Sequence, residues 1–340
     1  MSVAINGTNG ITYNDGSLQP SAPVGRNLII NGNMAINQRG SASYDITGAV
    51  YTLDRYRGGA SIASKFSIAQ GTTTPPAGFT NYLQVTSSAS TTIGSTNSYS
   101  FFQRVEGYNV ADLNWGTSDA QTVTMSFWVR STLTGTFGGK LQNSAQNRIY
   151  IFSYTISSAN TWEKKTITVT GDTTGTWLTT NGVGLSINFS VGAGSGKEAT
   201  AGSWGTDNIP IQPTGSTNVV ATSGATWQIT GLQLEAGTTA TPFEHLQYGT
   251  QLALCQRYFE VVDTGSANAA YGTPGAVSSG RVGYISYTYN TSKRANPTVV
   301  MASGGTLSTL QTAGLNVASA YASTDIYPRF NPGSTFSSEL

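Results

Sequence analysis

Short stretches of alternating apolar and polar residues recur along the chain, and each predicts a β-strand that buries one face. In one stretch, glycine and small polar residues alternate with Val183, Leu185, Ile187, Phe189 and Val191. In a second stretch the apolar positions are Val123, Met125, Phe127 and Val129. Residues 149–156 are apolar on both faces, which favours a central strand covered on both sides. Turn residues separate the stretches and no long segment has a period of 3.6. The pattern therefore predicts an all-β fold, a jelly-roll β-sandwich over residues 26–250.

The stretch WQITGLQLEAGTTATPFE, which begins at Trp227, changes its strand phase midway. Trp227 and Ile229 share one phase, whereas Leu232 and Leu234 share the opposite one. One extra residue at Thr230–Gly231 would return all four side chains to a common buried face. A β-bulge inserts such a residue, and glycine tolerates the backbone angles that it needs. The sequence therefore predicts a bulge at this point.

The two ends of the chain differ from the middle. Residues 1–25 are broken by Gly, Asn-Asp-Gly and two prolines and contain too little apolar surface for a core, so they are predicted to form an extended N-terminal arm. Residues 251–340 return to Gly, Ser and Ala turns, with strands expected near 282–289 and 298–302, and are predicted to form a smaller C-terminal β domain. At the junction, Leu252, Cys255 and Phe259 have spacings of three and four residues, which leaves both helix and strand open.

Composition narrows the classes of protein. Only 10% of the residues are charged, against about 25% in an ordinary soluble protein, so solubility depends on Ser, Thr, Asn, Gln and 40 glycines. The net charge of +1 provides no basic face for nucleic acid, and no apolar run is long enough to insert in a membrane. The N-terminus lacks the features of a secretory signal. The single cysteine, Cys255, excludes an intrachain disulfide and fits folding in a reducing cytoplasm.

Candidate catalytic groups are sparse. His245 and Cys255 are the only histidine and the only cysteine. Nothing in the sequence pattern places them together as a nucleophilic pair. One histidine and one thiolate are also too few for a zinc site, which needs three or four such ligands. Isolated acids such as Asp54, Glu106, Glu163 and Glu235 lie in or beside strands, where a structural hydrogen bond to the backbone or to arginine is expected. We therefore expect no enzyme activity and no cofactor. The sequence contains no loop with clustered acidic residues, so it gives little support for a structural calcium site.

Aromatic residues in glycine-rich or turn-rich contexts are the main signal for binding. Aromatic rings pack against the apolar face of a sugar, while amides and charged groups bond its hydroxyls. The residues that we predict as glycan contacts on this basis are Trp115, Trp177, Trp204, Tyr271, Tyr284, Tyr287, Tyr289 and Tyr327. For each tryptophan, packing in the core or in a subunit interface is the alternative.

Seven blocks of sequence resemble, in the same order, tail fibre and tail-tip proteins of tailed bacteriophages that contain a jelly roll like that of carbohydrate-binding modules. They are RNLIINGNMAINQRG at 26–40, YTLDR at 51–55, SFWVRS at 126–131, TWEKKTITVTGD at 161–172, LSINFSVGAGSG at 185–196, the closing block at 227–244 and LALCQRYFE at 252–260. Together they extend over roughly two thirds of the chain, and such motifs mark a scaffold better than they mark a ligand.

The resemblance implies a structural protein of the virion tail that is made in the host cytoplasm. It implies a homotrimer, because fibres of this kind are trimeric and symmetry multiplies weak sugar contacts. The arm would meet other tail or baseplate proteins or pack within the trimer, whose contacts we also expect around Leu252–Phe259. The host cell-surface polysaccharide would be the receptor. Two alternatives stay open: a non-receptor virion component such as a head decoration, neck or baseplate protein, and a polysaccharide-depolymerising tailspike.

Overall fold

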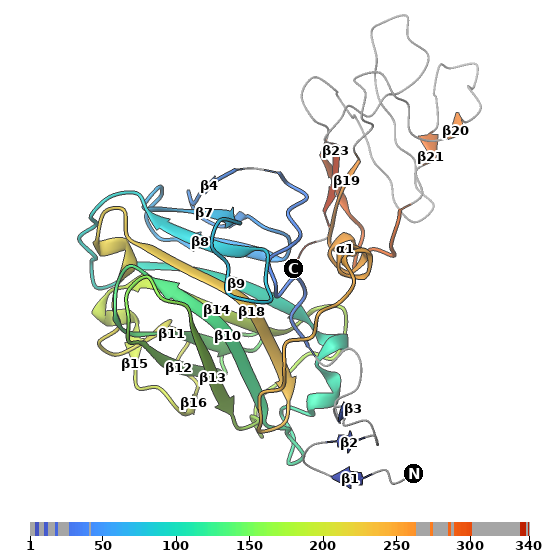
Figure 1. Cartoon of the computed structure of the whole chain (residues 1–340), viewed down its shortest axis with the longest axis horizontal. Coiled ribbons are helices and arrows are strands. Elements are labelled where there is room, and N and C mark those ends of the chain that lie inside the picture. Colours follow the sequence, from blue (N-terminus) through green and yellow to red (C-terminus); the bar gives the residue numbers. More distant parts are fainter. Residues whose placement is uncertain are drawn as a thin grey trace, which may run out of the picture.

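Two antiparallel β-sheets, packed face to face, make up most of the structure (Figure 1). The computed structural model describes residues 4–6, 10–12, 18–19, 27–40, 42–262, 273–274, 285–286, 289–300, 334–337 and 339. One sheet contains six strands and the other contains seven. The predicted all-β sandwich of jelly-roll type is confirmed.

Several neighbouring strands in each sheet are far apart in the sequence. The six-stranded sheet has the order β13 (Glu163–Val169), β10 (Val123–Ser131), β18 (Thr226–Ala236), β8 (Tyr82–Ser87), β7 (Phe66–Gly71) and β4 (Tyr44–Asp45). The seven-stranded sheet has the order β16 (Trp204–Gly205), β12 (Ile149–Ile156), β11 (Gly135–Gln142), β14 (Val183–Ala193), β9 (Ser98–Glu106), β6 (Tyr56–Ala60) and β5 (Val50–Tyr51). Three neighbouring pairs, β7 with β8, β11 with β12 and β5 with β6, are consecutive in the chain.

Smaller elements accompany the sandwich. Two short strands pair in parallel, β15 (Glu198–Ala199) and β17 (Gln212–Pro213). Short 3-10 turns occupy Gly107–Asn109, Ala111–Leu113, Ser195–Lys197 and Val219–Ala221. Near the N-terminus a three-stranded sheet consists of β1 (Ala4–Asn6), β2 (Gly10–Thr12) and β3 (Leu18–Gln19). After the sandwich come α1 (Tyr248–Gln256), a sheet of β19 (Phe259–Val262), β23 (Ser334–Ser337) and β22 (Thr298–Val300), and the pair β20 (Thr273–Pro274) and β21 (Ile285–Ser286).

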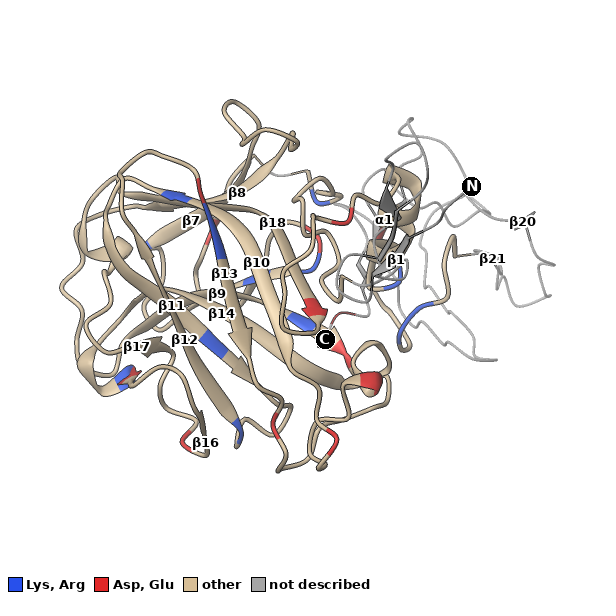
Figure 2. Cartoon of the chain, turned by 60° about the horizontal axis from the view of Figure 1, so that its bottom comes forward, with Lys and Arg blue, Asp and Glu red and all other residues tan. Residues whose placement is uncertain are grey.

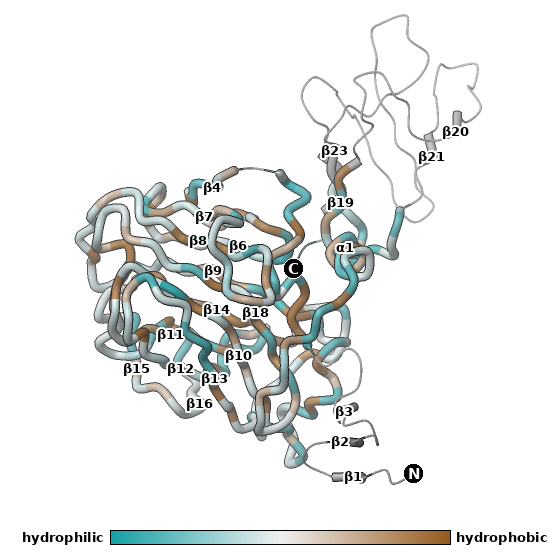
Figure 3. The backbone as a smooth tube through the Cα atoms, viewed as in Figure 1, coloured by the Kyte–Doolittle hydropathy of each residue, from teal (hydrophilic) through white to brown (hydrophobic). Residues whose placement is uncertain are grey.

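Aromatic side chains from both sheets meet at the centre of the core. Phe189 of the seven-stranded sheet packs against Phe127 at 5.3 Å and Trp227 at 5.8 Å between ring centroids, and both partners belong to the six-stranded sheet. Phe189 also stacks on its neighbour Phe101 at 5.3 Å. Apolar segments follow the strands that enclose this cluster (Figure 3). Edge-to-face and offset contacts of this kind add to the free energy gained by burying the rings.

The closing strand β18 contains the predicted bulge. Ser126 of β10 pairs with Gln233 and Trp128 pairs with Thr230, so the single residue Phe127 lies opposite both Gly231 and Leu232. Gly231 has φ +61°, the left-handed conformation expected at a bulge of this type. As predicted, the four apolar side chains of β18 on either side of the bulge all join the core.

The first motif block packs directly against the closing block. Asn27 donates from Nδ2 to the Leu232 carbonyl, and its Oδ1 accepts from the backbone N–H of Leu234. Leu28 donates its backbone N–H to the Leu234 carbonyl, and Leu232 donates to the carbonyl of Gly32. A Cβ on Gly32 would lie 2.1 Å from the Leu232 carbonyl oxygen, so only glycine allows this approach. The two blocks that carry the family resemblance are therefore one hydrogen-bonded unit.

A buried asparagine joins the same unit to the block at residues 51–55. Asn31 has φ +60°, and its Nδ2 donates to the carbonyls of Ile36 and Asp54. The Asp54 carboxylate in turn accepts from the backbone N–H of Gln38. Asparagine is one of the few residues other than glycine that tolerates this backbone conformation. The segment of residues 27–40 therefore follows a fixed path along one end of the sandwich.

Two predictions of strand environment are wrong. β14 is buried on both faces, not one, because residues 194–217 cover its outer side: the Ser190 hydroxyl donates to Gln212 Oε1 at 2.7 Å. β12 is not central, because only the two-residue β16 lies beyond it, and its outward residues Ser153 and Thr155 are exposed. Periodicity reports the polarity of the two faces and not which segment covers them.

The junction after residue 247 is helical. α1 extends from Tyr248 to Gln256, whereas Phe259 already begins β19. Cys255 and Tyr258 pack with Ile30 and Ile36 in a small second core. The predicted strands near 282–289 and 298–302 correspond in the described residues to β21 and β22. The domain boundary at 250/251 and the separate role of the N-terminal arm stay predictions.

Replacing Gly231 by alanine is expected to destabilise the sandwich for two reasons. The left-handed backbone costs about 1–2 kcal/mol for a residue with a Cβ. The new Cβ would also lie 2.6 Å from the Phe79 ring, and such overpacking costs about 1–3 kcal/mol more. Urea denaturation followed by tryptophan fluorescence measures the sum.

Gly224→Ala is the matched control, because Gly224 has φ +71° and nothing within 4 Å of the added Cβ. This variant should lose only the part of the unfolding free energy that comes from the left-handed backbone, about 1–2 kcal/mol. Equal losses in the two variants would show that Phe79 does not pack tightly over the bulge.

Candidate functional site

The three loop tryptophans predicted as glycan contacts come together. Trp115 and Trp177 have ring centroids 4.7 Å apart, and Trp204 lies 5.3 Å from the first and 5.4 Å from the second, all edge to face. The indole N–H groups donate to the backbone carbonyls of Gln121, Thr174 and Thr170. Trp115 and Trp177 are only 7% and 9% exposed. The cluster extends the core and presents little open ring surface, so a glycan role for these residues stays a prediction.

A pocket of about 220 Å³ lies beside this cluster. Trp115, Trp177 and Leu185 contribute apolar walls, while Asn114 and Thr179 contribute polar groups. Its size suits a small apolar group better than an extended oligosaccharide, because ligand sites for larger molecules are usually about 300 Å³ or more.

The predicted C-terminal tyrosines divide into two groups. Tyr271, Tyr284, Tyr287 and Tyr327 lie outside the described residues. Tyr289 is half-buried, and its ring centroid lies 5.1 Å from Nζ of Lys293, which forms an ion pair with the buried Glu260. Burial, followed by the charge of Glu260, raises the pKa of Tyr289. This tyrosine therefore belongs to a charged contact, and the contribution of all five to binding stays a prediction.

The sequence analysis missed a group of polar residues on the outer face of the seven-stranded sheet. Their neighbours in sequence, such as Phe101, Leu141 and Ile187, point into the core, so these side chains point outward. Cross-strand pairing aligns them in two adjacent rows. The first row is Arg57, Phe102, Asn188 and Lys140, and the second is Arg104, Ser186 and Gln142. We call these seven residues the polar strip. It combines one ring, two amides and three cations and contains no carboxylate.

The strip is open at one end only. Lys140, Gln142, Ser186 and Asn188 are buried. The segment before β17 crosses the sheet above β11, where the Lys140 ammonium donates to the Asn208 carbonyl at 3.5 Å. At the other end, Arg57, Phe102 and Arg104 on β6 and β9 are half-buried. A ligand can therefore reach the arginine end of the strip.

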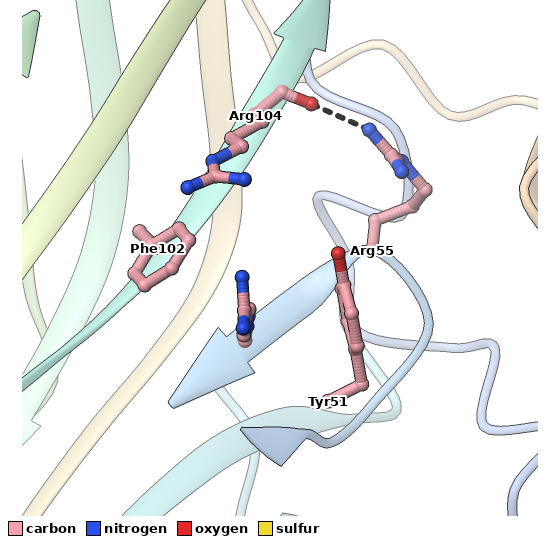
Figure 4. A pocket seen from close by; sticks show the side chains of 5 residues that line it. Tyr51, Arg55, Phe102 and Arg104 are labelled. Atoms are coloured by element: carbon pink, nitrogen blue, oxygen red, sulfur yellow. Dashed lines mark hydrogen bonds between the residues drawn. The ribbon is translucent and has the colours of Figure 1, made fainter. Parts of the chain in front are cut away.

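A small pocket at the arginine end is lined by Tyr51, Arg55, Arg57, Phe102 and Arg104 (Figure 4). Its volume is about 10 Å³, roughly that of one water molecule. The Arg57 guanidinium lies 5.1 Å from the Tyr51 ring and 5.9 Å from the Phe102 ring, and the Arg104 guanidinium lies 5.3 Å from Phe102. Arg55 has a different role, because it donates to the Arg104 carbonyl and lies 3.4 Å from the Tyr258 ring. The Arg57 and Arg104 guanidiniums, each near an aromatic ring, thus line one pocket.

Arg57 and Arg104 differ from the other arginines of the described chain because their guanidinium groups form no hydrogen bond or ion pair. Arg148 pairs with Asp172 at 2.7 Å, Arg257 with Glu106 at 2.6 Å and Arg39 with Glu339 at 2.9 Å. The buried Nε of Arg57 has no partner at all. Burial, followed by the charge of Arg57, lowers the pKa of Arg104. With charged residues sparse over the sheets (Figure 2), two unpaired neighbouring cations are a binding-site signal.

Lys140 is a third cation on the strip, and it forms no ion pair in the described structure, only the 3.5 Å hydrogen bond to the Asn208 carbonyl. It is 6% exposed, and burial together with the nearby Lys197 charge lowers its pKa to about 8. The side-chain oxygen of Gln142 in the second row is buried and accepts no hydrogen bond in the described structure. Buried polar groups without partners cost stability, and they persist mainly where another molecule completes them.

The acids considered as catalytic groups have structural partners. Glu106 accepts from Arg257 and from the Tyr258 hydroxyl, and these bonds outweigh burial to lower its pKa. Glu163 accepts backbone N–H groups at 2.9 and 2.8 Å, and Glu235 accepts from the Thr241 hydroxyl at 2.6 Å. The predicted structural roles of these carboxylates are confirmed.

The other candidate chemistry is also absent from the described residues. His245 packs between the rings of Phe79 and Phe243, whereas Cys255 is buried in the second core, where burial raises the pKa of its thiol. Within the described ranges, no three His, Cys, Asp or Glu side chains are grouped as metal ligands, and no helix is long and apolar enough to cross a membrane.

One signal in the sequence could have revealed part of the strip. Phe102 and Arg104 are two residues apart in the stretch SYSFFQRVE, so both point to the same face of a strand whose other face is apolar. Arg57 and Asn188 belong to other strands, and only the strand order brings them alongside.

No family model matches the chain, and no curated protein matches it. Among solved structures it is similar to the enzymatically active domain of tailspike protein 4 of bacteriophage CBA120, with 11% identity, a TM-score of 0.36, and coverage of 62% of this chain and 22% of that one. It is similar to an arabinose-bound α-L-arabinofuranosidase, with 15% identity, a TM-score of 0.32, and coverage of 58% and 24%.

A third similar structure is a family 11 carbohydrate-binding module from Clostridium thermocellum, bound to a β-1,3-1,4-mixed-linked tetrasaccharide, with 10% identity, a TM-score of 0.30, and coverage of 60% and 98%. The chain spans less than a quarter of each of the first two proteins. Identities and TM-scores this low transfer no ligand or activity to the chain.

Lys140→Met is expected to stabilise the protein at pH 7. The pKa of Lys140 falls from its ordinary 10.5 to about 8, so the folded state binds fewer protons than the unfolded state between these values and native stability rises with pH there. Below pH 8 the buried charge opposes folding, by about 3 kcal/mol. Thermal unfolding of both proteins from pH 6 to pH 10.5 should show an advantage for the variant that shrinks toward the alkaline end.

Lys164→Met, at an exposed position on β13, is the control and should leave the pH profile unchanged. A Lys140→Met profile parallel to that of the wild type would mean that Lys140 is fully hydrated in the folded protein.

Proposed function

We propose that this chain is a structural protein of a phage tail, a fibre or tail-tip component, that binds a glycan on the host cell surface through the polar strip. The observation that carries the binding role is the open end of the strip, because its two guanidinium groups form no hydrogen bond or ion pair within the described structure. Sugar sites combine one or a few aromatic rings with amide and charged groups that bond the hydroxyls. At this end Phe102 supplies the ring, and Arg57 and Arg104 supply the charged groups.

The phage assignment is supported by the sequence resemblance. Its first and closing blocks form one unit around Asn27 and Gly231, so the shared motifs correspond to a shared way of closing the sandwich. A virion protein must withstand conditions outside the cell, and an all-β core with few charges suits that requirement.

The proposal includes the absence of catalysis. Glycoside hydrolysis uses two carboxyl groups about 5–10 Å apart on either side of the scissile bond. No acid belongs to the strip, and the carboxylates of Glu106, Glu163 and Glu235 are engaged in structural bonds. A depolymerase role would need acids outside the described residues.

Glycan binding is tested with the full-length protein on an array of bacterial capsular and O-antigen polysaccharides. We expect binding to a small subset, with a single-site Kd in the micromolar to millimolar range because a sugar buries little surface. Phe102→Ala should weaken binding tenfold or more by removing the stacking ring. Tyr108→Ala is the control, because Tyr108 is 62% exposed but lies outside the strip.

If the Phe102→Ala variant binds as well as the wild type, the glycan site lies elsewhere. The next candidate is the C-terminal region from Val261, which contains four of the predicted tyrosines. Release of reducing ends from a bound polysaccharide would favour the tailspike alternative.

A homotrimer is the expected assembly. Tyr248 and Leu254 on α1 are exposed, at 64% and 36%, beside the buried second core. An interface around this helix would cover both side chains. Light scattering on full-length protein should give three times the chain mass of 35.6 kDa.

Tyr248→Lys combined with Leu254→Lys should shift that mass toward the monomer, whereas Tyr108→Lys should not. A wild-type monomer at micromolar concentration would contradict the trimer. A trimer that binds no surface polysaccharide would favour the non-receptor virion component.

A further inference from the structure

We infer that the polar strip selects an acidic glycan, and that a sugar carboxylate binds between Arg57 and Arg104. This inference rests on the proposed glycan-binding function and adds the chemical class of the ligand. It follows from where the unpaired cations lie, how their rings are packed and how little room the pocket offers.

The first observation is the juxtaposition of two cations without an anion. Arg57 on β6 and Arg104 on β9 flank Phe102, and neither guanidinium has a hydrogen bond or ion pair in the described structure. The Glu339 carboxylate, whose charge acts on Tyr51, already pairs with Arg39 at 2.9 Å, and the Glu106 carboxylate pairs with Arg257 at 2.6 Å. Like charges in a partly buried pocket repel, so an incoming anion would relieve that repulsion.

The second observation is the orientation of the guanidiniums. The Arg57 guanidinium has an aromatic ring near it in two places, Tyr51 at 5.1 Å and Phe102 at 5.9 Å from the ring centroids, and rings of this kind favour the face of a guanidinium. Its edge, which carries the N–H donors, is the part left for a ligand. The edge of a guanidinium matches the two coplanar oxygens of a carboxylate in a bidentate contact.

The third observation is the room available. The pocket between the two arginines has a volume of about 10 Å³, enough for one water-sized group. A carboxylate oxygen fits such a space while the sugar ring stays outside against Phe102. A tetrahedral phosphate or sulfate presents three oxygens around its centre and fits a flat, ring-bordered pocket less well.

The test uses small acids, so that it does not depend on knowing the host polysaccharide. Full-length protein is titrated with glucuronate, glucose and inorganic phosphate at low salt, and binding is followed by NMR of the arginine Nε–H signals. We expect millimolar binding of glucuronate, no measurable binding of glucose and at least tenfold weaker binding of phosphate. Arg57→Gln and Arg104→Gln should each weaken glucuronate binding tenfold or more.

Lys164→Gln removes an exposed positive charge from the other sheet and should leave glucuronate binding unchanged. Because neither arginine donates a hydrogen bond from its side chain to the protein, both arginine variants should unfold at the wild-type temperature or slightly above it.

The outcomes separate this inference from the proposed function. Equal binding of glucuronate and glucose, or glucuronate binding that survives both arginine substitutions, would overturn the carboxylate site while leaving glycan binding intact. Phosphate binding as strong as glucuronate binding would overturn the choice of carboxylate. Glucuronate binding at the arginines without binding of any surface polysaccharide on the array would support the anion site and contradict the proposed function.

Discussion

The hydrogen-bonded contact between the bulged strand β18 and the segment that begins at Asn27 determines how the rest of the sandwich is built. β18 lies inside the six-stranded sheet, and the bulge at Gly231 turns Leu232 and Leu234 back to the face that Trp227 and Ile229 already occupy. Asn27, Leu28 and Gly32 bond the backbone on the far side of that bulge. Without the extra residue, half of the strand would present its leucines to the wrong face of the sheet.

This closure has a consequence for the seven-stranded sheet. Because its inner face packs on aromatic rings from β10 and β18, polar side chains in β9, β11 and β14 must point outward. Several buried charged groups elsewhere form ion pairs that hold segments together, such as Arg148 with Asp172. Arg57, Arg104 and Lys140 form none in the described structure, and burial lowers the pKa of two of them. Groups that oppose folding are expected where they serve binding instead.

The local features of the fold could be predicted from sequence because they depend on neighbouring residues. The change of phase between Ile229 and Leu232 predicts the bulge without knowledge of the partner strand. The alternation at Val123–Val129 likewise predicts β10. The surroundings of a strand could not be predicted in this way. β14 reads as half-buried because its outward residues are small and polar, yet the chain around Gln212 covers them.

The candidate site depends still more on long-range order. Trp115, Trp177 and Trp204 come together because three segments of the chain end at the same place. The residues around each tryptophan in the sequence do not predict that the three rings pack together. The polar strip combines residues from four strands whose spatial order differs from their sequence order. A pattern on one strand, such as Phe102 with Arg104, identifies at most one segment of such a site.

A structure of the full-length protein bound to an acidic oligosaccharide, cut from a polysaccharide that the protein retains on the array, tests the central claim most directly. The account predicts the sugar over β6 and β9 on the outer face of the seven-stranded sheet, with one ring against Phe102 and a carboxylate within hydrogen-bond distance of Arg57 and Arg104. A sugar bound instead in the pocket beside Trp115, or against the chain beyond Val261 with the arginines untouched, would contradict it.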